Sequence, residues 1–258
     1  EYISSLDNGD RYMLKKWYQG RECDVRQEQD VVRAAAKLAV LHKDMEKLAV
    51  KIRPGADVQG KNPVEEVRRY NRELKKIRSF IRSRPVKNDF EILFLENFEK
   101  MYRTADDILA RMETSGCRKL FEESVSKGSV VHGDYNYHNI LILPGDTAIT
   151  NFEHMRIGIQ VQDLYYFLRK AMEKYRWKQK LGVGIIRAYE RQRRLEPGEW
   201  EYLGLQLAYP EKFWKTASSY CRSNKAWLPE KSVEKLELAV NQEEEKTNFL
   251  KTIFGIHL

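Results

Sequence analysis

Apolar residues recur with the 3.6-residue period of an amphipathic helix over most of the chain. We expect helices at residues 26–48, 63–84, 88–112, 118–125, 163–172, 182–195, 197–209, 211–221 and 229–254. Two of them carry start signals. Asn62 precedes a proline at the first helical position, and Asn88 is followed three residues later by Glu91. The pattern predicts a body that is mainly helical.

Strand-like patterns are confined to two parts of the chain. In the first, two β-rich runs within residues 2–18 flank Asn8-Gly9, which predicts a hairpin. In the second, residues 129–131 lead to an apolar run at 140–143, which turns through Pro144-Gly145-Asp146 into another β-rich run at 147–153. Residues 53–61 and 154–158 are expected to be loops. We therefore predict an α+β fold with hairpins inserted midway along a helical chain.

Composition indicates a folded globular protein, because 42% of the 258 residues are hydrophobic and 11% are aromatic. No apolar run approaches the length of a membrane span, and no signal-peptide pattern opens the chain. Because the chain begins at Glu1 rather than Met, we expect it to be a fragment. Cys23, Cys117 and Cys221 are an odd number without metal-ligand spacing, so we interpret them as reduced thiols of a protein made in the cytosol.

The net charge of +8 favours anionic partners such as nucleotides, phosphorylated compounds or polyanions. Many of the basic residues fall on the expected helix at 63–84, where lysine and arginine usually form a solvated face. No recognised nucleic-acid motif accompanies them, so nucleic-acid binding is not predicted.

Candidate chemistry is concentrated in His132-Gly133-Asp134, which follows a β-rich run, with Asn139 five residues after the aspartate. Phosphoryl-transfer loops have this spacing: the Asp accepts the proton of the attacking hydroxyl and the Asn binds magnesium. An Asp on the following hairpin then binds the metal that bridges the phosphates. At that third place this chain has Asn151.

An amide at position 151 lacks the charge that holds magnesium against nucleotide phosphates, which predicts a weakened metal site. Glu153 is a candidate replacement ligand, because residues two apart on a strand share a face. A purely structural role for Glu153 is the other interpretation, and the sequence leaves both open.

Other polar residues near these motifs have structural interpretations. His42 ends an apolar helix stripe and is expected to be a packed, hydrogen-bonded core residue. His138 is expected to order the loop through its ring nitrogens, and Tyr135 and Tyr137 to pack. Asp163, at a helix start, is expected to accept backbone or histidine N–H bonds through its carboxylate.

The segment from His132 to Asn139 resembles the catalytic loop of the aminoglycoside phosphotransferase and choline kinase superfamily. More narrowly, the chain resembles the spore coat protein S (CotS) family in four blocks, at residues 12–23, 38–42, 132–141 and 163–170. The resemblance implies a protein kinase-like fold of aminoglycoside phosphotransferase type. Residues 1–19 would be a truncated small lobe with the hinge, and residues 20–258 a mainly helical large lobe.

The same resemblance implies roles, cofactors and partners. Asp134 would be the catalytic base, Asn139 a metal ligand, and Asn151 would occupy the place of the metal-binding Asp; Trp17 and Tyr18 would form the hinge beside the adenine. ATP and Mg²⁺ would be the cofactors of an active protein. The implied partners are other spore coat proteins, with a nucleotide and a hydroxyl-bearing small molecule as ligands. The chain would be made in the cytoplasm and placed on the spore coat.

Three hypotheses follow. The leading one is a spore coat protein with a kinase-like fold and impaired or lost phosphotransfer, because of Asn151 and because no glycine-rich loop or strand lysine precedes the hinge. The alternative is an active ATP-dependent phosphotransferase acting on a hydroxyl acceptor. The third, a polyanion-binding helical protein, depends on the charge alone.

Overall fold

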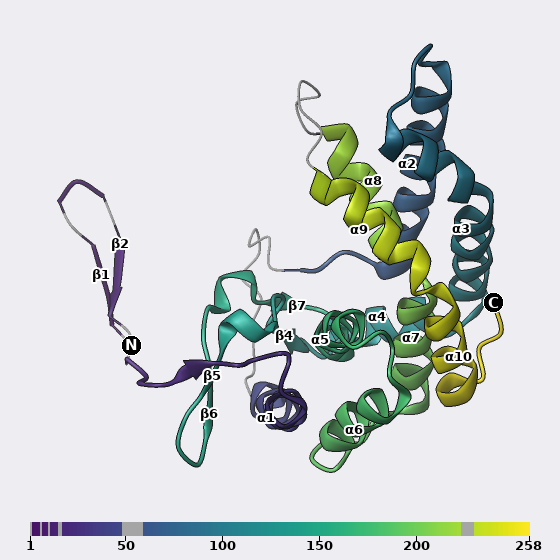
Figure 1. Ribbon diagram of the computed structural model, residues 1–258. Coiled ribbons are helices and arrows are strands. Elements are labelled where there is room, and N and C mark those ends of the chain that lie inside the picture. Colours follow the sequence, from purple (N-terminus) through teal and green to yellow (C-terminus); the bar gives the residue numbers. More distant parts are fainter. Residues whose placement is uncertain (1, 6, 10, 15–16, 48–58, 223–229) are drawn as a thin grey trace.

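The computed structural model describes residues 2–5, 7–9, 11–14, 17–47, 59–222 and 230–258, and it is mainly helical (Figure 1). The helices are α1 (Glu28–Glu46), α2 (Pro63–Ser83), α3 (Asp89–Thr114), α4 (Cys117–Ser126), α5 (Val161–Lys174), α6 (Gln179–Glu190), α7 (Pro197–Ala208), α8 (Glu211–Arg222), α9 (Glu230–Asn241) and α10 (Glu243–Phe254). None of these helices is long and apolar enough to cross a membrane. The predicted α+β class is confirmed.

Short strands form three small antiparallel sheets. The strands are β1 (Tyr2–Ser5), β2 (Arg11–Leu14), β3 (Arg21–Glu22), β4 (Val130–Val131), β5 (Ile140–Ile142), β6 (Thr147–Ile149) and β7 (Arg156–Ile157). β1 pairs with β2, β4 with β7, and the three-stranded sheet has the order β3-β5-β6. The hairpin β1–β2 stands apart from the helical body in Figure 1. The predicted hairpin at Asn8-Gly9 is therefore confirmed, although residues 6, 10 and 15–16 lie outside the described parts of the chain.

The helices gather in two groups around the short strands. α2, α3, α8 and α9 lie together at the top of Figure 1, and α1 and α6 at the bottom, with β4, β7 and α5 between them. The rings of Tyr135, Tyr189 and Tyr202 are fully buried in the continuous core that joins the groups. Buried aromatic rings of this size contribute most to such a core.

Both predicted helix starts are present. The side chain of Asn62 accepts the backbone N–H of Val64 at 3.0 Å. Asn88 accepts the N–H of Glu91 at 3.0 Å, and the Glu91 carboxylate accepts the Asn88 N–H at 3.2 Å. Each such cap stabilises a helix by about 1 kcal/mol.

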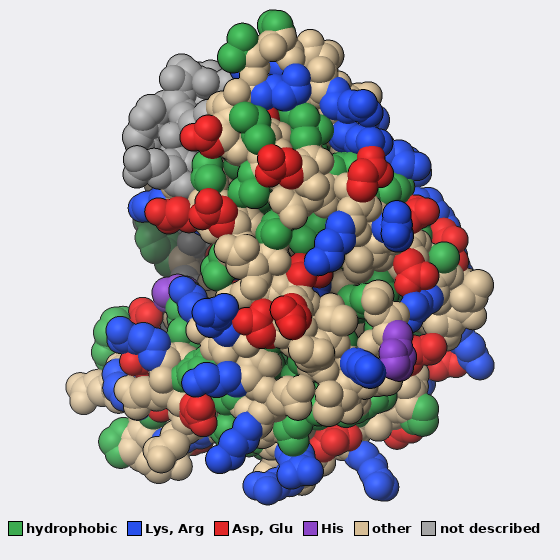
Figure 2. All heavy atoms as spheres, turned by 45° about the vertical axis from the view of Figure 1, so that its right-hand side comes forward, with side chains coloured by type: hydrophobic (Ala, Val, Ile, Leu, Met, Phe, Trp, Pro, Cys, Tyr) green, Lys and Arg blue, Asp and Glu red, His purple; other side chains and the backbone are tan. Residues whose placement is uncertain are grey.

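The basic residues of α2 are partly engaged in ion pairs, as expected for a solvated face. Arg68 lies 2.6 Å from Glu113 and Arg69 lies 3.1 Å from Glu66. Figure 2 shows Lys and Arg side chains interspersed with acidic ones over the face that it presents. This distribution does not favour a binding surface for a long polyanion there.

Two expectations are wrong in detail. The single helix expected at 229–254 is broken at Gln242, whose buried side chain donates to the Glu173 carbonyl oxygen at the end of α5, at 3.0 Å. The loop expected at 154–158 contains β7, and the strand β3 was not predicted. Two-residue strands are too short to show a period, and they exist because a distant strand pairs with them. The loop expected at 53–61 lies mostly outside the described residues.

Candidate functional site

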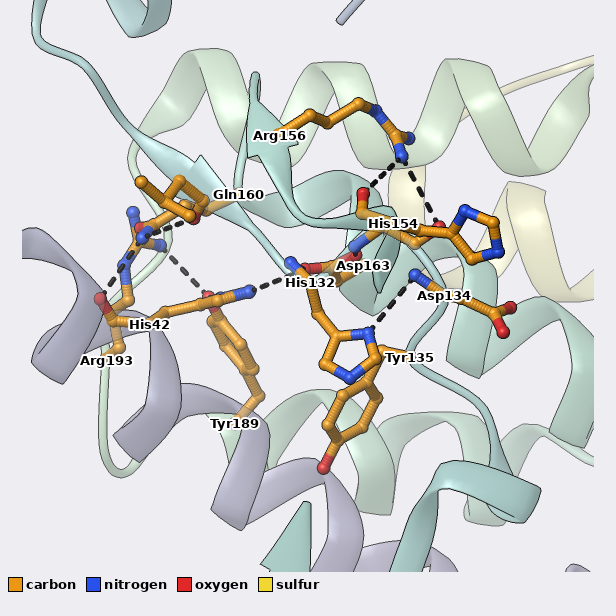
Figure 3. Close-up of polar contacts among 12 residues, drawn as sticks. His42, His132, Asp134, Tyr135, His154, Arg156, Gln160, Asp163, Tyr189 and Arg193 are labelled. Carbon is orange, nitrogen blue, oxygen red and sulfur yellow. Dashed lines mark hydrogen bonds and ion pairs between the residues drawn. The ribbon is translucent and has the colours of Figure 1, made fainter. Parts of the chain in front are cut away.

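One buried carboxylate fixes the start of the loop between β4 and β5. Asp163, in the first turn of α5, accepts the backbone N–H of His132 at 2.6 Å and that of Gly133 at 2.9 Å (Figure 3). The role expected for Asp163 is confirmed. Hydrogen bonds to a charged acceptor are stronger than neutral ones, so this contact holds the loop firmly against the helix.

A chain of buried polar groups continues behind Asp163. His42 Nε2 lies 3.3 Å from the Asp163 carboxylate, and His42 Nδ1 lies 2.7 Å from the Tyr189 hydroxyl (Figure 3). Arg193 donates to the same hydroxyl at 3.2 Å. A neutral His42 that is protonated on Nε2 satisfies both of its contacts. The prediction of a packed, hydrogen-bonded histidine is confirmed.

The His132 ring spans the loop from the inside. Its Nδ1 accepts the backbone N–H of Asp134 at 3.2 Å, and its Nε2 donates to the Thr150 carbonyl oxygen at 3.0 Å. Gly133 adopts φ +80, and a Cβ at this position would overlap the His154 carbonyl oxygen and the Arg156 guanidinium. Only glycine combines this backbone angle with so close an approach. The loop and the segment after β6 are thereby tied together.

The side chains of Asp134, Asn139 and Asn151 lie next to one another. The Asp134 carboxylate accepts an amide N–H from Asn139 at 2.9 Å and one from Asn136, also at 2.9 Å. The other end of the Asn139 side chain, Oδ1, faces Asn151 Nδ2 at 3.4 Å. Asn136, which sequence reasoning missed, also caps the turn η1 (Tyr137–Asn139) by accepting the N–H of His138. The signal for Asn136 was present, since Asn is frequent at such caps.

Asn151 has a left-handed backbone, with φ 63 and ψ 64, at the start of the turn η2 (Phe152–His154). Asn is among the residues that adopt this conformation at least cost. The Glu153 carboxylate is exposed and lies 3.6 Å from His154 Nε2. The shared strand face expected for Asn151 and Glu153 does not exist, because β6 ends at Ile149. Glu153 as a replacement metal ligand stays a prediction.

The donor set fits magnesium poorly. Mg²⁺ sites in phosphoryl-transfer proteins are usually built from one or two carboxylates together with the substrate phosphates. Here the groups that face one another are two neutral amides, and the nearby Asp134 carboxylate already accepts two N–H groups. Among the described residues, no group of three or more His, Cys, Asp or Glu side chains could hold a metal ion.

The remaining predicted residues lie around the loop. Trp17 is 86% exposed and, with Tyr18, precedes β3, which pairs with β5 directly after the loop. His138 Nδ1 lies 3.1 Å from the Glu22 carboxylate of β3, so His138 does tie the loop to its neighbour. The Tyr135 hydroxyl donates to the Ala34 carbonyl oxygen at 2.8 Å, which confirms its packing role.

A cavity of about 460 Å³ lies beside Gly133. It is lined by residues from the start of α2, from β7, from α5 and from α7, among them Arg156, Tyr166 and Gln206. Sequence reasoning missed it, because the loop expected at 154–158 gave no reason to single out Arg156. The cavity therefore opens next to the loop that carries Asp134.

Residues 2–205 match the family described as the phosphotransferase enzyme family. The chain belongs to this family. The chain is also 24% identical over 163 residues to spore coat protein S of Bacillus subtilis (strain 168), across 62% of this chain and 46% of that relative. The predicted resemblance is therefore confirmed, and the chain spans less than half the length of this relative.

Solved structures of phosphotransferases share the fold. An aminoglycoside phosphotransferase from Alicyclobacillus acidocaldarius superposes with a TM-score of 0.83 at 19% identity, across 98% of this chain and 73% of that one. Amicoumacin kinase hAmiN, in complex with AMP-PNP, Ca²⁺ and Ami, gives 0.53 at 13% identity, across 90% and 64%. ADP-bound aminoglycoside phosphotransferase APH(2″)-Ib gives 0.53 at 13%, across 95% and 75%. This member of the phosphotransferase family thus has the aminoglycoside phosphotransferase fold.

Proposed function

We propose that this phosphotransferase-family chain is a spore coat protein whose phosphotransfer activity is impaired or lost, and whose working role is in coat assembly. Its likeness to spore coat protein S supports the coat context. In this proposal residues 1–19 are the remainder of a small lobe with the hinge at Trp17 and Tyr18, and residues 20–258 are the large lobe.

The observation that carries the proposal is the contact between Asn139 and Asn151. Asn139 donates its amide N–H to Asp134, so its Oδ1 is turned towards position 151. Asn151 meets that oxygen with an N–H, which completes a polar chain that needs no cation. A carboxylate at position 151 would instead face Asn139 Oδ1 with oxygen, and two facing oxygens call for a metal ion between them.

The alternative function is an active ATP-dependent phosphotransferase that acts on a hydroxyl acceptor. The contact of Asp134 with Asn139 supports it, because these residues correspond to the base and to one metal ligand of the phosphotransfer template. Asp134 would accept the hydroxyl proton, and Asn139 with Asn151 or Glu153 would have to hold the divalent ion. Two neighbours in fold are solved with AMP-PNP and Ca²⁺ or with ADP, so ATP and Mg²⁺ would be the cofactors.

Thermal unfolding with and without Mg²⁺-ATP separates the two functions. We expect the nucleotide to leave the melting temperature of the wild-type protein unchanged and to raise that of Asn151→Asp. Glu153→Gln is the matched control, and it should behave as the wild type does. A metal-dependent rise in the wild type, with turnover that Asp134→Ala abolishes, would establish the active enzyme instead.

The coat role has a separate test. A fluorescent fusion of this chain, produced in sporulating Bacillus subtilis, should form a ring on the developing spore. Fluorescence that stays diffuse in the mother-cell cytoplasm would contradict coat assembly.

A further inference from the structure

The cavity beside Gly133 is lined by both acidic and basic side chains. Its lining includes the carboxylates of Glu66, Glu211 and Asp163 and the cations Lys61 and Arg156. Which of these charges already has a partner decides what the cavity can bind, because only an uncompensated charge near low-dielectric walls attracts a ligand strongly.

The three carboxylates are engaged. Glu66 lies 3.1 Å from Arg69, and Glu211 lies 3.4 Å from Arg169. The Asp163 carboxylate is occupied by the two backbone N–H groups of the catalytic loop. A cationic ligand would therefore have to compete with arginines and backbone donors that are already in place.

Arg156, unlike these carboxylates, has no oppositely charged partner among the described residues. Its Nη1 makes only two long contacts to backbone carbonyl oxygens, 3.3 Å to His154 and 3.5 Å to Gly133 (Figure 3). Within the part of the chain that the structure describes, no carboxylate lies within ion-pair distance of its guanidinium, and its Nε and Nη2 have no acceptor. The edge of the guanidinium formed by Nε and Nη2 is thus a pair of parallel donors that matches the two oxygens of a carboxylate or phosphate.

Two further features supply the rest of a site. Tyr202 lies behind the cavity wall, one helical turn before the lining residue Gln206; it does not itself line the cavity, and its buried hydroxyl has no partner among the described residues. A buried polar group without a partner usually marks a place for a water molecule or a ligand. The rings of Tyr70 and Tyr166 form part of the wall and offer an apolar surface to the body of a ligand.

We propose that this cavity binds a small ligand that carries a carboxylate or phosphate group, with two oxygens on the free edge of the Arg156 guanidinium. Lys61, at the rim, adds a second positive charge. The tyrosine rings contact the rest of the ligand. Binding requires neither nucleotide nor divalent ion, so the cavity works as a ligand site even where phosphotransfer is lost, which goes beyond the function proposed above.

Calorimetric titration of the whole chain, without nucleotide or metal, tests the site. The probes are benzoate and phenyl phosphate, with benzamide as the uncharged counterpart of benzoate. We expect at least one anion to bind the wild-type protein and benzamide to bind about 10-fold more weakly or not at all. Whichever anion binds more tightly identifies the oxyanion that the site prefers.

Variants locate the binding. Arg156→Met should lower the affinity for the more tightly bound anion by about 10-fold or more. Arg156→Lys keeps the charge but loses the planar pair of donors, so its affinity should lie between those of the wild type and Arg156→Met. Arg187→Met removes an exposed arginine of α6 that does not line the cavity, and should leave binding unchanged. Melting temperatures near that of the wild type show that the variants are folded.

The proposal is overturned if neither anion binds at about 10 mM, if benzamide binds as well as benzoate, or if Arg156→Met binds as the wild type does. Because the titration contains no metal and no nucleotide, each of these results leaves the function proposed above standing. Conversely, magnesium binding by the wild-type protein would contradict that function and leave this site untouched.

Discussion

The carboxylate of Asp163 lies 2.6 Å from the backbone nitrogen of His132, so the first turn of α5 directly holds the start of the loop between β4 and β5. The same carboxylate lies 3.3 Å from His42 of α1. Two helices and the loop therefore meet at one buried acid. This meeting point fixes the start of the loop without any contribution from Asn151.

Asp163→Asn should destabilise the protein. The new amide can present only one oxygen, so one of the backbone N–H groups of His132 and Gly133 loses its acceptor while it remains buried. We expect the free energy of unfolding to fall by about 2–4 kcal/mol, measured by urea titration. Glu122→Gln, at an exposed acid of α4, is the control, and it should change stability by less than about 0.5 kcal/mol. Equal stability of the two variants would show that the Asp163 bonds contribute little.

Gly133→Ala and Gly145→Ala separate a steric clash from an unfavourable backbone angle. Both glycines have positive φ, +80 and +78, but an added Cβ at Gly145 meets open space, whereas at Gly133 it overlaps a carbonyl oxygen and a guanidinium. We expect about 1 kcal/mol of destabilisation for Gly145→Ala and about 3 kcal/mol or more for Gly133→Ala. Chemical denaturation measures both, and similar losses would show that the segment after β6 yields easily.

Stability should fall with acid in part through Glu173. Burial raises the pKa of this carboxyl. Arg169 at 2.6 Å and Lys212 at 3.3 Å together lower the pKa by more than burial raises it, so the net result is a pKa below the ordinary 4.5. A group whose pKa is lowered on folding contributes stability above its unfolded pKa. That contribution is lost as the pH falls through the folded value.

Glu173→Gln should therefore lose stability at pH 7 and become less sensitive to acid. We expect a loss of about 2 kcal/mol at neutral pH, and a shallower decline of the unfolding free energy as the pH falls below the ordinary pKa of 4.5. Urea titrations over this pH range provide the measurement, with Glu122→Gln again as the exposed control. A decline as steep as that of the wild type would exclude Glu173 as a source of the acid sensitivity.

Local signals account for what could be predicted from the sequence. The starts of α2 and α3 follow from Asn62 and Asn88, since capping depends on residues within one turn. Asp134, Asn139 and Asn151 were singled out by the spacing of the phosphoryl-transfer template, and Asn139 contacts both of the other two.

Long-range contacts account for what could not be predicted. β7 exists because β4 pairs with it, and the break at Gln242 exists because its amide reaches a carbonyl of α5. The position of Arg156 in the cavity wall depends on both β7 and the start of α2, which lie far apart in the sequence. Neither periodicity nor a motif records such contacts.

In the proposed function, the hydrogen bond between the amides of Asn139 and Asn151 takes the place of a divalent ion bound by a carboxylate at position 151. Mn²⁺ affinity in the presence of AMP-PNP, followed by electron paramagnetic resonance, tests it most directly. We predict that Asn151→Asp binds the ion at least about 10-fold more tightly than the wild-type protein, because it restores a negative charge at the metal-binding place. Equal affinity of the two proteins would contradict the claim.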